Sequence, residues 1–166
     1  PTHLSCYWDP AFGHEAGDRS VLALVLFDDQ DHAYIHDLVY IRIDKDQDID
    51  AATQQCRTVI TFLRRHGVRH MRIEGNGIGQ FLPGLLRKQL RQEQYACGIE
   101  VIHNSMNKNQ RILHAFEARL AARELSMHRR VAETEFPHEM RLWQADTPHN
   151  QDDALDAVAG ALIRHT

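Results

Sequence analysis

The sequence lacks the features that would assign it to a membrane, to an oxidising compartment or to zinc. None of its apolar runs reaches the roughly 18 residues that a membrane-spanning helix needs, and no signal-peptide pattern opens it. Its three cysteines, Cys6, Cys56 and Cys97, are far apart and odd in number, so neither a disulfide framework nor a paired zinc site is indicated. Its twelve histidines do not form the His-Glu-x-x-His pattern of zinc proteases. We therefore expect a protein of a reducing cytoplasm that has no membrane contact.

A strong positive charge, the usual sign of a nucleic-acid-binding domain, is also missing, because the formal net charge is −4. The distribution of charge is more informative than its sum. Residues 28–50 carry eight aspartates against two basic residues, whereas basic residues crowd the middle and later part of the chain. These basic residues are Arg64, Arg65, Arg87, Lys88, Arg91, Lys108, Arg111, Arg119, Arg123, Arg129 and Arg130. One face of the protein could be basic enough to hold a phosphate backbone, although ordinary solvated helix faces would give the same pattern.

The length of 166 residues, with 43% hydrophobic and 25% charged residues, is that of a single globular domain spanning 1–166. Turn residues separate three strands, after which strand and helix patterns alternate. Asp50 is expected to cap the first helix and Gly67 to end it. The expected strands are 4–9, 20–27, 33–43, 68–74 and 98–103; the expected helices are 51–66, 79–93, 108–124, one containing Phe136 to Trp143, and 151–164, with an extended piece at 125–131.

A meander of three strands, followed by right-handed β-α-β crossovers, predicts an α/β domain with a five-stranded mixed sheet flanked by helices. In such a sheet the first and fourth strands can lie side by side. That arrangement would bring Asp9 and Glu74 together, although they are 65 positions apart. This order of elements is similar to that of the ribonuclease H-like fold.

Acidic residues stand where the expected strands end and where the last helix begins. Asp9 ends the first strand, Glu74 ends the fourth, and the last helix opens with Asp152, Asp153 and Asp156. Oxygen-only ligands suit Mg²⁺ or Mn²⁺ rather than zinc. A pair of such ions clamps the attacking and leaving oxygens during phosphodiester cleavage. These acids therefore predict a metal-dependent nuclease.

Each group of acids also has a simpler interpretation. Asp9 precedes a proline and could merely form a turn. Asp153 and Asp156 are neighbours on one flank of a helix start, where acids interact favourably with the helix dipole. Their like charges repel, however, and a bound cation removes that repulsion more completely. The register of the helix decides whether Asp152 points inward as well.

Two further segments could contact phosphate. The glycine-rich segment 75–79 leaves space for a backbone or a phosphate to approach closely. No Lys-Ser/Thr pair follows it, so it is not a Walker motif. ATP hydrolysis by this chain is therefore not expected. The segment 107–111 lies at a predicted helix N-terminus, where backbone N–H groups together with Lys108 and Arg111 could form a phosphate-binding site. An ordinary solvated helix start is the alternative.

Four segments resemble, in their order and spacing, the C-terminal nuclease domain of phage terminase large subunits, and the resemblance extends from residue 6 to residue 163. The segments are Trp8-Asp9-Pro10-Ala11, Ile73-Glu74-Gly75-Asn76-Gly77-Ile78-Gly79, Asn107-Lys108-Asn109-Gln110-Arg111-Ile112 and Asp152-Asp153-Ala154-Leu155-Asp156-Ala157. The resemblance implies a ribonuclease H-like fold, two divalent cations (Mg²⁺ or Mn²⁺) and endonucleolytic cutting of concatemeric viral double-stranded DNA during genome packaging. It implies the cytoplasm of the infected host cell as the place of action.

The resemblance also implies a role for each matching acid. Asp9 would bridge both ions, and Glu74 would bind one of them. Asp153 would complete the catalytic set of Asp9, Glu74 and Asp153. Asp156 would be a further or water-mediated metal ligand.

Lys108 and Arg111 match the basic position of the family and would contact the DNA or the scissile phosphate. The partners of the family are a packaging ATPase domain on the same polypeptide, expected to lie outside residues 1–166, a small terminase subunit and the portal. Two alternatives stay open. One is another ribonuclease H-like nuclease, such as a Holliday-junction resolvase or a transposase-like enzyme. The other is a non-catalytic DNA-binding or assembly module whose acids only cap helices and turns.

Overall fold

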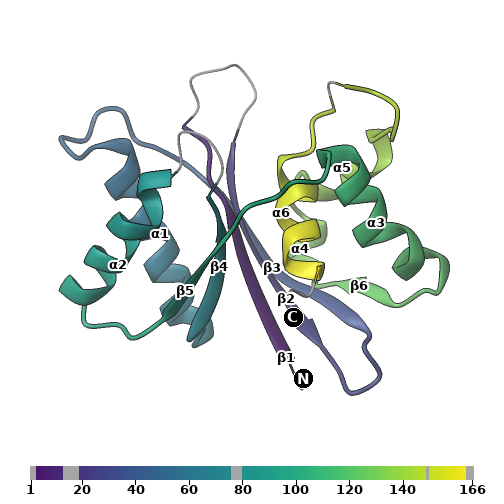
Figure 1. The fold of residues 1–166 in the computed structure, drawn as a ribbon, viewed down its shortest axis with the longest axis horizontal. Helices are drawn as coiled ribbons and strands as arrows, with labels where there is room; N and C mark the ends of the chain where they lie inside the picture. Colours follow the sequence, from purple (N-terminus) through teal and green to yellow (C-terminus); the bar gives the residue numbers. More distant parts are fainter. Residues whose placement is uncertain (1–2, 13–18, 76–79, 149, 164–166) are drawn as a thin grey trace.

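The computed structural model describes residues 3–12, 19–75, 80–148 and 150–163, and in them one mixed sheet lies between two groups of helices (Figure 1). The strands are β1 (His3–Asp9), β2 (Ser20–Phe27), β3 (Ala33–Ile41), β4 (His70–Glu74), β5 (Gly98–Ile102) and β6 (Leu125–Met127). The helices are α1 (Ala51–His66), α2 (Leu82–Gln92), α3 (Lys108–Ala121), α4 (Arg129–Ala132), α5 (Phe136–Leu142) and α6 (Asp153–Leu162). None of these described helices is long and apolar enough to span a bilayer. The expected α/β class is confirmed.

The sheet has the strand order β5-β4-β1-β2-β3-β6. β1, β2 and β3 form the expected antiparallel meander, while β4 and β5 run parallel to β1. β1 and β4 pair directly, as predicted, with Trp8 opposite Ile73. Asp9 and Glu74 are the next residues along these two strands, so they stand together at the carboxyl ends of adjacent parallel strands.

The expected number of five strands is wrong, because the described part of the chain forms six. The additional strand, β6, pairs in parallel with β3 at the edge of the sheet. It has only three residues. Three residues are too few to show the period-two pattern that identifies a strand, so the segment 125–131 was expected only to be extended.

Both faces of the sheet are covered by helices, which explains the uninterrupted apolar sequence of β2. Leu22 and Leu24 pack into the core beneath α1 and α2, whereas Val21, Ala23 and Val25 pack into the core beneath α3, α5 and α6. Figure 1 shows α1 and α2 on one side of the sheet and the later helices on the other. The sheet is therefore the central layer of a three-layer domain.

Helix α6 is buried from Ala154 to Leu162 and lies on the sheet, in contact with β1 and β2. Its residues are mostly small. Gly160 packs so closely on the ring of Tyr7 that a Cβ atom at this position would lie 2.5 Å from ring carbons. A glycine is therefore required here for α6 to approach β1, the strand that ends in Asp9.

Helix α1 begins and ends at the residues that its sequence predicts. The Asp50 carboxylate accepts a hydrogen bond from the Thr53 backbone N–H at 2.8 Å. Gly67 ends the helix in the left-handed conformation, with φ of 63°, where glycine pays no steric penalty.

Candidate metal centre

Three acids that are far apart in the sequence converge on one point. Asp9 at the end of β1, Glu74 at the end of β4 and Asp156 on the first turn of α6 each offer one carboxylate oxygen, and these atoms all lie within 4.8 Å of one another. The structure therefore brings together three of the acids that the sequence singled out. Carboxylates are the ligands that Mg²⁺ and Mn²⁺ prefer.

The three acids strongly perturb one another. Burial raises the pKa of Asp9 well above its usual value, and the nearby charges of Asp156 and Glu74 raise it further. Burial also raises the pKa of Asp156, although Arg111 opposes this effect. Burial acts to raise the pKa of Glu74, but hydrogen bonds with Asp9 and Asn104 and the charges of Arg111 and Lys108 together lower it on balance. The crowding of three carboxylates therefore favours either a proton on Asp9 or a bound divalent cation, and the cation offsets more of the negative charge.

Asn104, two residues beyond β5, belongs to this site although no motif indicated it. Its Nδ2 atom donates to Glu74 Oε1 at 3.2 Å and to the Tyr7 hydroxyl at 3.1 Å. The one signal that could have found it is its position, since it follows a parallel strand whose carboxyl end meets the edge where Asp9 and Glu74 lie.

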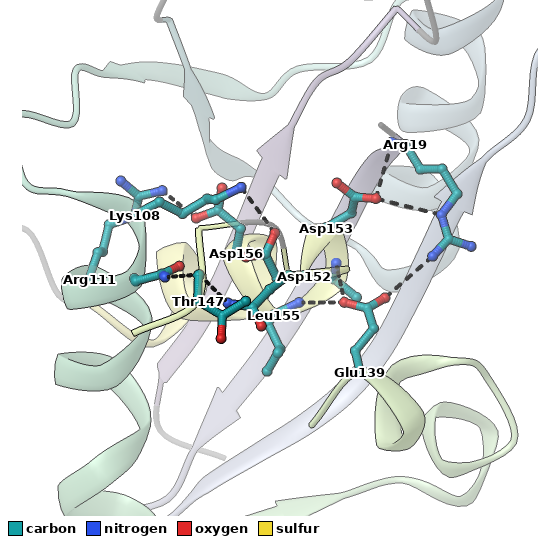
Figure 2. A network of polar contacts seen from close by, with 12 residues as sticks. Arg19, Lys108, Arg111, Glu139, Thr147, Asp152, Asp153, Leu155 and Asp156 are labelled. Atoms are coloured by element: carbon teal, nitrogen blue, oxygen red, sulfur yellow. Dashed lines mark hydrogen bonds and ion pairs between the residues drawn. The ribbon is translucent and has the colours of Figure 1, made fainter. Parts of the chain in front are cut away.

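The two predicted phosphate ligands lie beside the acids of α6. Arg111 is buried, with 6% of its surface exposed, and forms an ion pair with Asp156. Lys108 is about half exposed, and its Nζ atom lies 3.0 Å from Asp152 Oδ1. The two pairs join the start of α3 to the start of α6 (Figure 2). Contact of either residue with DNA stays a prediction.

Asp153, which the family resemblance placed in the catalytic set, points to a different neighbour. Its Oδ2 atom accepts from the Arg19 backbone N–H at 3.3 Å and lies 3.6 Å from Arg19 Nε. Three residues of helix turn the side chains of Asp153 and Asp156 about 60° apart. Asp153 is not one of the three clustered acids, and its role as a metal ligand stays a prediction.

Glu139 of α5 holds the start of α6, and no sequence motif indicated this role. Its side chain is 3% exposed. Its Oε1 atom accepts from the backbone N–H groups of Ala154 at 3.0 Å and Leu155 at 3.3 Å. Its Oε2 atom accepts from the Tyr40 hydroxyl at 2.6 Å and lies 3.5 Å from an Arg19 guanidinium nitrogen. Figure 2 shows Glu139 and Arg19 on the flank of α6 opposite Lys108 and Arg111.

Arg72 of β4 holds the other end of α6. Its buried guanidinium donates to the carbonyl oxygen of Ile163 at 2.7 Å, to that of Ala161 at 3.4 Å and to the Ser5 hydroxyl. Ser5 in turn donates to the Ala161 carbonyl at 2.7 Å. These bonds satisfy carbonyl groups that a helix leaves without partners at its last turn.

Two arginines of α2 and one just before β4 lie away from the acids. Arg69, Arg87 and Arg91 line an open cavity of about 720 Å³ beside Tyr95, near the beginnings of β4 and β5. None of these three arginines forms an ion pair within the residues that the structure describes. A basic surface therefore exists at the end of β4 remote from Glu74. The glycine-rich segment, apart from Gly75, lies outside the described residues.

The chain is similar to known proteins in sequence family and in fold. A family model described as "Terminase RNaseH-like domain" matches residues 6–165. No curated protein matches the sequence. Among solved structures, a mutant gp2c of the large terminase subunit of bacteriophage Sf6, with calcium, has a TM-score of 0.67 at 10% identity and covers 98% of this chain and 88% of its own.

Two resolvases share the fold. The yeast mitochondrial Holliday junction resolvase Ydc2 has a TM-score of 0.55 at 8% identity, covering 96% of this chain and 76% of its own. RuvC of T. thermophilus in complex with a Holliday junction substrate has a TM-score of 0.51 at 13% identity, covering 96% and 91%. At these identities the likeness shows the fold alone, and it confirms the expected ribonuclease H-like architecture.

Proposed function

Because the chain belongs to the family of terminase RNase H-like domains, we propose that it is a divalent-metal-dependent endonuclease that cuts concatemeric viral double-stranded DNA during genome packaging. The observation that carries this proposal is the convergence of Asp9, Glu74 and Asp156, whose ligand atoms lie within 4.8 Å of one another. Acids from two strand ends and a helix would not be crowded together at such electrostatic cost for capping alone.

The residues present fit divalent cations. All three converging groups are carboxylates, and burial together with the charges of Asp156 and Glu74 raises the pKa of Asp9. When bound, Mg²⁺ or Mn²⁺ ions would supply the charge that activates water and stabilises the departing oxygen of the phosphodiester. The similarity to a terminase subunit solved with calcium supports a divalent ion.

Five residues of the chain either hold the cations or keep the metal ligands in place. Asp9, Glu74 and Asp156 hold the cations. Asn104 fixes the orientation of Glu74 through its hydrogen bond to Oε1. Arg111 offsets part of the charge of Asp156 and holds its carboxylate in place.

Asp153, which the family resemblance places in the catalytic set, is the further ligand in this proposal. Its carboxylate is held by Arg19. It would therefore serve a second ion only after releasing Arg19, whereas Asp156 already lies with Asp9 and Glu74. Asp156 is accordingly the acid of α6 that we assign to the primary site.

Double-stranded DNA is the proposed substrate, with a packaging ATPase domain on the same polypeptide, a small terminase subunit and the portal as proposed partners. The shared fold of RuvC in complex with a Holliday junction substrate supports DNA as the ligand of this architecture. Lys108 is the better candidate for a contact with the scissile phosphate, because it is 49% exposed whereas Arg111 is buried.

The proposal is tested by incubating the purified protein with supercoiled plasmid. We expect nicked and linear DNA with Mn²⁺ and intact plasmid with EDTA. Asp9→Asn should abolish cutting and leave the circular dichroism spectrum unchanged, because it removes one ligand without altering side-chain size. Asp48→Asn, a change of an exposed acid in the loop before α1, is the control and should cut like the wild type. Wild-type cutting by Asp9→Asn would refute the assignment of the site.

A Holliday-junction resolvase is the second candidate, favoured by the fold similarity to Ydc2 and RuvC. The two candidates separate in a competition between labelled four-way junctions and linear duplex. Preferential cleavage of the junction supports the resolvase, and equal cleavage supports the terminase-like enzyme. A protein that cuts neither substrate, and whose melting temperature is insensitive to Mn²⁺, would instead be a non-catalytic module.

A further inference from the structure

Helix α6, which carries the metal-centre acid Asp156, begins without a side-chain cap of its own. Its N-cap residue, Asp152, makes no capping hydrogen bond, although aspartate is among the residues best suited to that task. Asp152 is instead buried, with 2% of its surface exposed, and its Oδ1 atom is paired with Lys108 at 3.0 Å. The backbone N–H groups at the start of α6 therefore need an acceptor from elsewhere.

Glu139 supplies that acceptor from another helix. Its Oε1 atom receives the N–H groups of Ala154 and Leu155, the two residues that immediately precede Asp156. The carboxylate is negative and sits at the positive end of the helix dipole, which strengthens both bonds.

The Glu139 carboxylate is itself fixed from two further directions. Tyr40 on β3 donates its hydroxyl to Oε2 at 2.6 Å. Arg19, next to the start of β2, lies 3.5 Å from the same oxygen, and its guanidinium also lies over the Tyr40 ring at 4.4 Å. A buried side chain with hydrogen bonds on both oxygens has little freedom to move. It therefore holds the start of α6 at a fixed position relative to the sheet.

We propose that Glu139 is a positioning residue that sets the rotation and depth of α6, and thereby places Asp156 within reach of Asp9 and Glu74. This role rests on the metal centre proposed above. A ligand constellation must be held to within about 0.5 Å and 10–20° to work. Asp156 is the one ligand of the three on a helix, so it depends most on how that helix is anchored.

A matched control lies one turn earlier on the same segment. Glu135 also pairs with Arg19, at 2.6 Å, but its side chain is 64% exposed. Glu135→Gln therefore removes a carboxylate from Arg19 without touching the start of α6. Glu139→Gln keeps an oxygen that can accept from Ala154 and Leu155, so it separates the hydrogen bonds from the charge.

The test is the affinity for Mn²⁺ without DNA, measured by isothermal titration calorimetry well below the melting temperature of each variant. Glu139→Ala should weaken Mn²⁺ binding by about tenfold, the lower end of what the loss of a group that orients a metal ligand costs. Glu139→Gln should weaken it by about threefold, because the amide oxygen can still accept from the N–H groups of Ala154 and Leu155 but the negative charge is lost. Glu135→Gln should bind Mn²⁺ like the wild type.

A residue that only stabilises the fold would lower the melting temperature and leave the Mn²⁺ affinity of the folded protein unchanged, and that result overturns the proposal. If Glu139→Ala does not fold, Tyr40→Phe takes its place, since it removes one anchor of Glu139. Wild-type affinity in both Tyr40→Phe and Glu139→Gln then overturns the proposal. Absence of Mn²⁺ binding by the wild type would refute the metal centre itself, which is a different outcome.

Discussion

Helices α1 and α6 are anchored in opposite ways. α1 is capped by its own sequence neighbours, Asp50 at the start and Gly67 at the end. The free backbone groups at the ends of α6 bond to residues of other elements. Glu139 of α5 accepts from N–H groups at the start, and Arg72 of β4 donates to carbonyl groups at the end. Glu139 lies on the preceding helix and Arg72 lies 91 residues before Ile163, so α6 is positioned by tertiary contacts rather than by its own flanking residues.

The difference follows from what each helix has to do. α1 covers one face of the sheet through an apolar stripe and carries none of the three clustered acids. α6 lies against the sheet through Gly160 and carries Asp156, so a small shift would both create a steric conflict with Tyr7 and displace a ligand. Local caps suffice for a scaffold helix, whereas the ligand-bearing helix is fixed by anchors on other elements, one of which, β4, also carries the ligand Glu74.

The largest expected effect separates the two acids on the first turn of α6. Asp156→Asn should lower plasmid cleavage by more than about 100-fold, since even a group that only orients a ligand contributes roughly 10- to 100-fold. Asp153→Asn should have a smaller effect, because its carboxylate is held by Arg19. Cleavage rates with Mn²⁺ in excess measure both.

The reverse order would contradict our assignment of Asp156. If Asp153→Asn abolished cleavage and Asp156→Asn cut normally, the assignment that the family resemblance implies would be correct. Arg19→Gln then becomes the informative variant, because it would show whether Asp153 works only when Arg19 releases it.

The same contrast explains what could be predicted from the sequence. The caps of α1 and the meander of β1 to β3 are signalled by neighbouring residues, so they were predicted with nearly correct bounds. β6 was missed because three residues carry no periodicity. The pairing of β1 with β4 was predictable from the order of elements, and with it the meeting of Asp9 and Glu74.

The detailed arrangement at α6 could not be predicted in the same way. Which of Asp152, Asp153 and Asp156 faces the strand ends depends on the rotation of the helix. That rotation is set by Glu139, Arg72 and the contact of Gly160 with Tyr7, none of which is local in the sequence. Asn104 was missed for the same reason, because its partners Glu74 and Tyr7 approach it only in the folded sheet.

Removal of the anchor at the far end of α6 should have the next largest effect. Arg72→Met leaves the buried acceptors of Ile163 and Ser5 without their donor, and we expect a loss of about 2–3 kcal/mol in the free energy of unfolding. Urea denaturation measures this loss. Arg64→Met is the control, because Arg64 also donates to a backbone carbonyl but is exposed, and it should change stability by no more than about 0.5 kcal/mol. Equal losses in the two variants would show that the far end of α6 needs no buried anchor.

The pH dependence of stability should have opposite signs for acids of the two regions. The pKa of Asp50 is lowered by its hydrogen bonds with Thr53, so its contribution is present above the unfolded value of about 3.9 and is lost as the pH falls through its folded value. The pKa of Asp9 is raised by burial, so its contribution is present below about pH 3.9 and is lost as the pH rises through its folded value.

In the metal-free protein, Asp9→Asn should therefore flatten the decline of stability with rising pH, and Asp50→Asn should flatten the loss in acid. Urea midpoints in EDTA over a pH series measure both slopes. Mn²⁺ should reverse the decline in the wild type, because the ion binds the deprotonated acids. If Asp9→Asn still loses stability with rising pH as steeply as the wild type, other groups cause that loss.

The smallest effect is expected from the cap of α1. Asp50→Ala should lower the free energy of unfolding by about 1 kcal/mol, the usual cost of an N-cap, which corresponds to roughly 2–4 °C in the melting temperature of a domain of this size. Asp48→Ala, which removes an exposed acid two residues earlier, should change the melting temperature by less. Neither variant should change the Mn²⁺ affinity, because neither Asp48 nor Asp50 belongs to the cluster of Asp9, Glu74 and Asp156. A weaker affinity in Asp50→Ala would show that the two helices are coupled through the sheet, and the division between a self-capped scaffold helix and an externally anchored ligand helix would then fail.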